Sequence, residues 1–125
     1  ESLTKMYGVD ILASEETQGE ATDLAWLEVD CVRVKGREAP TRLFALVGDD
    51  KLARSAAFVA LRARHSDMLE AYRACRFMDA AAAAEKLGDE NAEIASLYRA
   101  FADLAREAAA MPAGAWSAVR VLDSK

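Results

Sequence analysis

The chain has 125 residues, the size of one ordinary domain, and its 16 basic and 21 acidic side chains give a net charge of −5. An acidic balance argues against a general nucleic-acid-binding protein, which is usually basic. The apolar content of 53% is too high for a disordered chain. No apolar run reaches the roughly 18 residues of a membrane span. From the charge we expect no nucleic-acid partner, and from the short apolar runs no direct membrane contact from this segment.

The first part of the chain predicts an α+β arrangement. The residues before Gly8 have helical spacing, and Gly8 is expected to end that helix. Residues 9–13 form a short apolar run that suits a strand. Ser14 is expected to cap a second helix of about one turn, which Gly19 ends.

Residues 26–35 and 42–47 predict the two strands of a β-hairpin, with a turn over residues 36–40. The apolar residues occupy odd positions as far as Cys31 and even positions from Val32 onward. Because strand side chains alternate with a period of two, this change predicts a bulge or sharp twist near Cys31.

Gly48 and the two acids that follow it mark the expected boundary between two segments, residues 1–48 and 49–125. The charge balance changes at the same place. Residues 1–50 hold 5 basic and 11 acidic side chains (5 − 11 = −6), whereas residues 51–125 hold 11 and 10 (11 − 10 = +1).

From about residue 52 the apolar spacing predicts helices. The alanines from Ala80 to Ala84 would let two helices approach closely, and Gly88 is expected to cap the first of them. This pair resembles a single tetratricopeptide-like hairpin. Residues 116–122 alternate weakly and predict a short closing strand.

The sequence contains no recognisable catalytic constellation. His65 is the only histidine, so it cannot form a multi-histidine metal site, and we expect it to be solvated on a helix. Cys31 and Cys75 form no close pair and are expected to be small buried apolar residues in a reducing compartment. The acidic pairs at 15–16 and 49–50 can bind a cation, but helix capping is the commoner role.

Three basic residues alternate through the predicted hairpin: Arg33, Lys35 and Arg37. They would project from one face of the strand into the turn. Such a row can neutralise phosphates, with lysine acting as a point charge and arginine as a fork. The alternative is an edge strand that its charges protect from pairing.

The same stretch resembles the late part of a class III nucleotidyl cyclase domain. The resemblance covers residues 3–12 (LTKMYGVDIL), 14–17 (SEET) and 27–37 (LEVDCVRVKGR), and it continues through Pro40 to residues 42–44 (RLF). In that family a helix end leads to a strand, a short helix and a hairpin with a VKG turn. The resemblance implies that the first segment is the C-terminal part of a catalytic domain, with a partial cyclase-type sheet.

The second segment resembles the helical tail of bacterial cyclases that carry an extracellular sensor. The matching residues are 71–74 (AYRA), 77–80 (FMDA), 116–122 (WSAVRVL) and Lys125. The resemblance implies a cytoplasmic location for this chain, within a parent that an upstream sensor region can anchor to the inner membrane.

The resemblance implies a parent adenylate or guanylate cyclase. We favour an adenylate cyclase, which converts ATP to cyclic AMP and pyrophosphate, because this activity is the commoner one in bacteria. In the family, two Mg²⁺ ions held by two aspartates activate the 3′-hydroxyl and bind the triphosphate. By the family pattern these aspartates precede residue 1. We therefore expect this fragment to be inactive and to bind no metal itself. From the family pattern only Lys35 carries over, as a residue that binds the triphosphate across a dimer interface. Arg33 and Arg37 are weaker candidates for phosphate binding, because they alternate with Lys35.

A different class of function remains open: a non-catalytic helical module for protein interaction or regulation, with a cyclase-like hairpin. In either case the absent upstream strands would leave the hairpin edges unsatisfied and one apolar face uncovered. A truncated sheet of this kind pairs with another copy or packs on its own tail. We expect a homodimer, exchanged or not, that buries Trp26 or Phe44.

Overall fold

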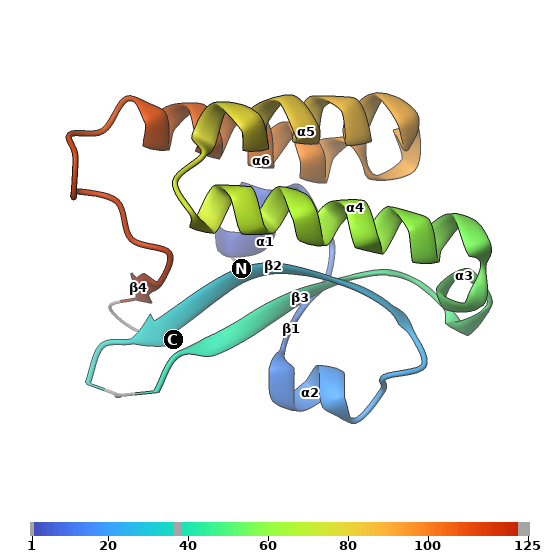
Figure 1. Ribbon diagram of the computed structural model, residues 1–125. Coiled ribbons are helices and arrows are strands. Elements are labelled where there is room, and N and C mark those ends of the chain that lie inside the picture. Colours follow the sequence, from blue (N-terminus) through green and yellow to red (C-terminus); the bar gives the residue numbers. More distant parts are fainter. Residues whose placement is uncertain (1, 37–38, 123–125) are drawn as a thin grey trace.

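The computed structural model describes residues 2–36 and 39–122. The fold is α+β, with the long helices stacked over one face of a single sheet (Figure 1). The elements in chain order are α1 (Ser2–Tyr7), β1 (Leu12–Ser14), α2 (Glu15–Gly19), β2 (Ala25–Val34), β3 (Thr41–Gly48), α3 (Asp50–Arg54), α4 (Ala56–Arg73), α5 (Phe77–Glu90), the 3₁₀ turn η1 (Ala92–Ile94), α6 (Ala95–Ala109) and β4 (Arg120–Leu122).

The sheet has the order β1-β3-β2-β4. Strands β2 and β3 form the predicted antiparallel hairpin, and β1 pairs antiparallel with the outer edge of β3. The predicted closing strand is present as β4, which pairs parallel with the outer edge of β2. The expectation of unsatisfied hairpin edges is wrong where these pairings occur, because the chain supplies its own neighbouring strands.

The predicted break in the alternation of β2 is present. Glu28 pairs with Phe44 and Asp30 with Leu43, so the register shifts around Val29, two residues before the expected position. As a result, the successive residues Val29 and Asp30 are both buried. The bulge therefore turns a carboxylate inward beside an apolar side chain.

Strand β1 begins later than the predicted strand over residues 9–13. Gly8 adopts a φ of 65° after α1, and the Val9 N–H donates to the Thr4 carbonyl at 3.1 Å. The backbone is thus still ending the helix where the apolar run begins, and Ile11 remains about half exposed (49%).

The predicted caps hold the short helices. The Ser14 hydroxyl accepts from the Thr17 N–H at 3.3 Å at the start of α2. The Asp49 carboxylate accepts from the Leu52 N–H at 3.1 Å at the start of α3. Glu15 instead accepts a hydrogen bond from the backbone of β3. Capping and strand contacts thus engage residues of both acidic pairs.

One hydrophobic core joins the two segments predicted from the sequence. It includes Tyr7, Leu27 and Val29 from the first segment and Phe58, Met68, Leu87, Tyr98 and Phe101 from the second.

The aromatic rings of the hairpin are buried within a single chain. Trp26 is 7% exposed and Phe44 is 9% exposed. The Trp26 indole N–H donates to the Ala21 carbonyl at 2.8 Å. Both rings are therefore already buried without a second copy, and the homodimer stays a prediction.

Helices α5 and α6 pack closely through small residues, as the alanine run predicts. Ala80, Ala81 and Ala84 of α5 are buried. Gly88 lies inside α5 and does not cap it. A Cβ atom at Gly88 would lie 3.3 Å from the Tyr98 Cβ atom, so this glycine allows the two helices to approach.

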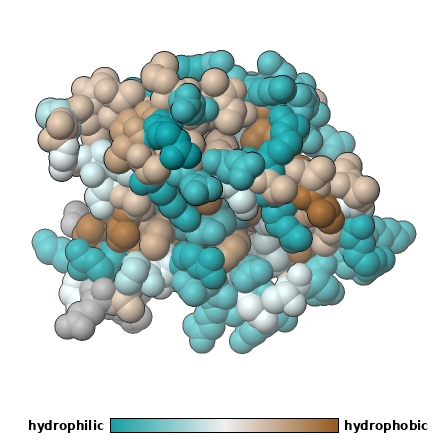
Figure 2. Space-filling view, viewed as in Figure 1, coloured by the Kyte–Doolittle hydropathy of each residue, from teal (hydrophilic) through white to brown (hydrophobic). Residues whose placement is uncertain are grey.

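The molecular face drawn in Figure 2 is largely hydrophilic, and its strongly apolar atoms lie in separate groups. The large apolar side chains that the described residues expose belong to different elements and connections: Met6, Ile11, Leu52, Val59, Met78, Met111 and Val121.

Replacing Gly8 should test the packing between α1 and α6. An alanine there would strain the left-handed backbone and bring its Cβ atom within 2.9 Å of the Ser96 Cβ atom. We expect Gly8→Ala to lower the free energy of unfolding in urea by at least about 2 kcal/mol.

Gly19→Ala is the matched control. Nothing lies within 4 Å of a Cβ atom at Gly19, so its unfolding free energy should stay the same or rise by up to about 1 kcal/mol. Equal stability of Gly8→Ala and the wild type would contradict this contact.

Candidate functional site

Lys35 lies directly after the last residue of β2, at the turn of the hairpin. Its side chain is exposed, and its ammonium makes no hydrogen bond or ion pair with the residues that the structure describes. Its backbone N–H, however, donates to the Leu122 carbonyl at 2.7 Å. The backbone of Lys35 is held in place while its charge remains accessible.

The other two basic residues do not extend this site into a regular row. Arg33 lies within β2, is half buried, and stands opposite Val121 of β4. It interacts within the fold. Arg37 lies outside the described residues. Lys35 is therefore the exposed cation that the described part of this row presents to solvent.

A buried carboxylate lies behind the turn. Asp30 is 8% exposed, and its Oδ2 atom accepts from the Tyr7 hydroxyl and from Nε of Arg120, each at 2.8 Å. Its Oδ1 atom accepts from the Cys31 N–H, also at 2.8 Å. Nη2 of Arg120 lies 3.5 Å from the Tyr7 oxygen. This cluster connects α1, β2 and β4.

The surroundings of Tyr7 and Arg120 raise the pKa of both groups. Burial raises the pKa of Tyr7 well above its ordinary value, and the charge of Asp30 adds to the effect. Burial alone would lower the pKa of Arg120, but the hydrogen bond and charge of Asp30 raise it. Tyr7 therefore donates as a neutral phenol and Arg120 remains a cation, so the cluster is an ionic clamp.

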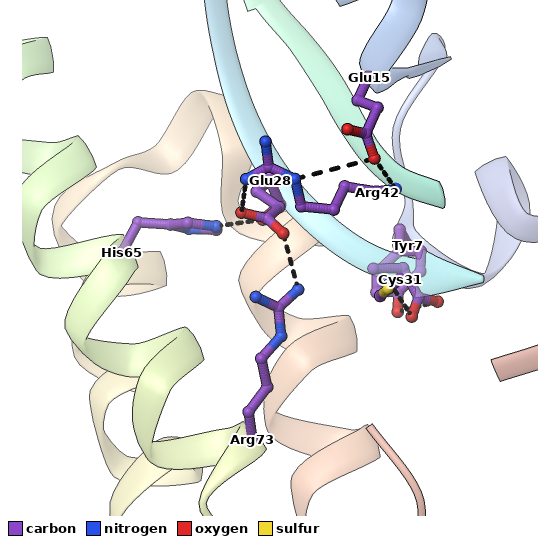
Figure 3. A network of polar contacts seen from close by, with 8 residues as sticks. Tyr7, Glu15, Glu28, Cys31, Arg42, His65 and Arg73 are labelled. Atoms are coloured by element: carbon purple, nitrogen blue, oxygen red, sulfur yellow. Dashed lines mark hydrogen bonds and ion pairs between the residues drawn. The ribbon is translucent and has the colours of Figure 1, made fainter. Parts of the chain in front are cut away.

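Glu28 is the centre of a second polar network (Figure 3). Its Oε2 atom accepts from Arg73 at 2.9 Å, and its Oε1 atom lies 3.6 Å from Nη1 of Arg42. Arg42 in turn donates its backbone N–H to Glu15 at 2.8 Å. The Glu28 carbonyl lies 2.6 Å from Nε2 of His65. This network ties α4 to β2 next to the bulge.

His65 is buried, with 2% of its surface exposed, so the expectation of a solvated residue is wrong. It follows Leu61 by four residues and so lies on the apolar stripe of α4. Because the Glu28 carbonyl can only accept, Nε2 of His65 carries the proton, and Nδ1 accepts from the Tyr98 hydroxyl at 2.9 Å. Burial lowers the pKa of His65.

The cysteines do not follow the expectation of burial. Cys31 is half buried, and burial raises the pKa of its thiol. Cys75 is exposed, with a φ of 66°, at the end of α4. The Cys75 N–H donates to the Tyr72 carbonyl at 3.1 Å and the Arg76 N–H to the Ala71 carbonyl at 2.8 Å. Cys75 thus occupies the left-handed position that usually belongs to glycine.

The described residues include no group of three or more histidine, cysteine, aspartate or glutamate side chains that could hold a metal ion. None of the helices in residues 2–36 and 39–122 combines the length and the apolar character that crossing a bilayer requires. No protein-family model, curated protein or solved structure matches the chain. The interpretation of the site therefore depends on its own residues.

Sequence reasoning missed the buried clamp and the Glu28 network. A signal for both was present, because the carboxylates of Glu28 and Asp30 alternate with apolar residues in a strand whose only other charged residue is Arg33. Arg120 is likewise the only charged residue in the weakly alternating stretch 116–122. Charges at such positions need partners when their strand is buried.

The His65 environment predicts a specific pH dependence of stability. The unfolded chain binds a proton at His65 near pH 6.5, whereas burial keeps the ring neutral in the fold until a lower pH. The unfolded state therefore binds more protons as the pH falls below about 6.5, and stability is lost there with a slope of at most about 1.4 kcal/mol per pH unit. Above that pH the full stability is present.

Urea unfolding between pH 8 and pH 5.5 measures this slope. The negative charge of Glu28 raises the pKa of His65, and the positive charge of Arg73 lowers it. Because His65 is the only histidine, its imidazole signals in nitrogen-edited NMR report its tautomer and titration directly. Titration of the folded ring at or above the ordinary histidine pKa would contradict the burial argument.

Proposed function

We propose that this chain is the C-terminal part of a class III nucleotidyl cyclase that converts ATP to cyclic AMP and pyrophosphate in intracellular signalling. In this proposal Lys35 binds the triphosphate of ATP. The observation that carries it is the exposed ammonium of Lys35, which has no partner among the described residues. It lies at a backbone-anchored turn, within a hairpin whose sequence resembles that of the family.

The order of elements in the first segment supports the proposal. The family resemblance implies a helix end, a strand, a short helix and a hairpin, and α1, β1, α2, β2 and β3 follow in that order. The VKG residues span the end of β2 and the start of its turn. An order of elements alone is common to many folds, so Lys35 carries the functional part of the argument.

Lys35 suits recognition of phosphate better than it suits bond making. A lysine ammonium is a compact point charge on a flexible stem that can follow an anion. The described residues include no group of three or more histidine, cysteine, aspartate or glutamate side chains that could hold a metal ion near this turn. We therefore assign to this chain a binding contact and assign the reacting groups to the rest of the parent enzyme.

The remaining parts of the proposal concern the parent enzyme. Its Mg²⁺ ions would be held by residues outside this chain, since the described residues do not fit a metal site, and no step on this chain involves the metal. A homodimer would bring Lys35 to the partner subunit's ATP. The chain would lie in the cytoplasm, with an upstream sensor region able to anchor the parent to the inner membrane.

One observation favours the alternative of a non-catalytic interaction or regulatory module. The chain's own strands pair with both edges of the hairpin, and its own helices share the core beneath it. Such a fold does not depend on upstream strands for its core. Formation of cyclic AMP from MgATP by the intact protein would favour the cyclase, and its absence would favour the module.

Lys35→Ala in the intact protein is the sharpest test of the phosphate contact. Loss of one charge-assisted contact should cost about 1.5–3 kcal/mol, which is roughly a ten- to hundredfold loss in kcat/KM. If the contact is equally strong in the ground and transition states, the loss appears in KM, and kcat falls as well if the contact tightens during the reaction.

Lys51→Ala is the matched control, because Lys51 is also exposed but lies on α3, away from the hairpin turn. It should leave both constants unchanged. Thermal unfolding of both variants must match the wild type. A Lys35→Ala enzyme whose kcat/KM stays within about twofold of wild type would remove the phosphate role.

A further inference from the structure

The segment that follows α6 returns to the sheet as a strap, which we define as residues 110–122. It leaves the end of α6, passes along one end of the molecule and finishes as β4 beside β2 (Figure 1). Two of its side chains make the most specific contacts with the rest of the fold: Trp116 and Arg120.

Trp116 packs into an aromatic group. The centroid of its ring lies 5.1 Å from the ring centroid of Tyr72 and 5.0 Å from that of Phe77, and both pairs are edge-to-face. A hollow of about 260 Å³ lies beside the strap, and its lining includes Leu104 of α6, Trp116 and Arg120 of the strap, and Asp30 of β2. The strap is therefore held at separate points.

Arg120 is the second point, and it is ionic. Its Nε atom donates to Asp30 at 2.8 Å, and the side chain is 30% exposed against 8% for Asp30. A carboxylate as buried as Asp30 is costly without its partner. The attraction therefore fixes β4 against the edge of β2.

The pairing of β4 extends from Arg120 to the backbone of Lys35. Arg120 stands opposite Val32, and Leu122 stands opposite Val34. The next contact is the hydrogen bond from the Lys35 N–H to the Leu122 carbonyl. Arg120 thus lies two residues from the bond that holds the turn.

We propose that Arg120 is a positioning residue for Lys35. By pairing with Asp30 it holds β4 on the edge of β2, and β4 holds the backbone of Lys35 at the angle from which the ammonium reaches phosphate. This role deepens the proposed function and rests on it. It also means that the end of the tail completes the phosphate-binding turn.

Amide hydrogen exchange in the chain tests the structural half of this inference. In Arg120→Ala, the Lys35 amide should exchange at least about tenfold faster than in the wild type, while the amide of Ala102 in the buried part of α6 should not change. Arg120→Lys keeps the positive charge but lacks the planar guanidinium, so the exchange rate of the Lys35 amide should increase by less than in Arg120→Ala. Arg54→Ala removes an exposed arginine that pairs with Asp50, and it should leave both amides unchanged.

A double-mutant cycle in the intact protein tests the functional half. Arg120→Ala should lower kcat/KM for ATP about tenfold when Lys35 is present and by less than about twofold in the Lys35→Ala background. A purely structural loss would lower kcat/KM equally in both backgrounds.

The outcomes separate the two proposals. If Lys35→Ala alone changes nothing, the phosphate role is wrong, and the positioning role is wrong with it. If Lys35→Ala lowers kcat/KM but Arg120→Ala acts equally in both backgrounds, the phosphate role stands and the positioning role is wrong. An unchanged exchange rate at the Lys35 amide in Arg120→Ala would also overturn the positioning role.

Discussion

Removing a carboxylate from water costs several kcal/mol unless cations and hydrogen-bond donors surround it, and Asp30 meets this requirement with groups from distant parts of the chain. The Tyr7 hydroxyl comes from the first helix, the Cys31 N–H from the same strand, and the Arg120 guanidinium from the last strand. Because each donor must stay within hydrogen-bonding distance, the carboxylate ties the N-terminal helix and the C-terminal strand to the middle of the sheet.

The bulge around Val29 makes this arrangement possible and links it to the second network. One register shift places Val29 in the core and turns Asp30 inward, while Glu28 faces Arg73 and Arg42. The Glu28 carbonyl receives the hydrogen bond from the buried histidine of α4. Strand β2 is thus held by helix α4 on one side of the bulge and by the ionic clamp on the other.

These ties explain what the hairpin can offer to a ligand. A turn whose backbone is bonded to a neighbouring strand loses little further freedom on binding, so an anion meets a charge that is already placed. Under our proposal Lys35 provides this charge, and its flexible side chain can follow the position of the anion. The described residues supply placement and electrostatics, and under our proposal the bond-making groups belong to the rest of the parent enzyme.

The sequence by itself determined the local features: the hairpin, the break in its alternation, and the cap at Ser14. These depend on neighbours within a few residues, where periodicity and side-chain preference act directly. It also indicated Lys35 as a candidate site, because a basic residue next to a turn glycine can be recognised from the sequence alone. Only the tertiary structure decided that His65 is buried and that Asp30 meets Arg120, 90 residues away. The partner of a buried charge depends on which distant segment the fold brings within 3 Å. Alternation and spacing within one segment do not identify that partner.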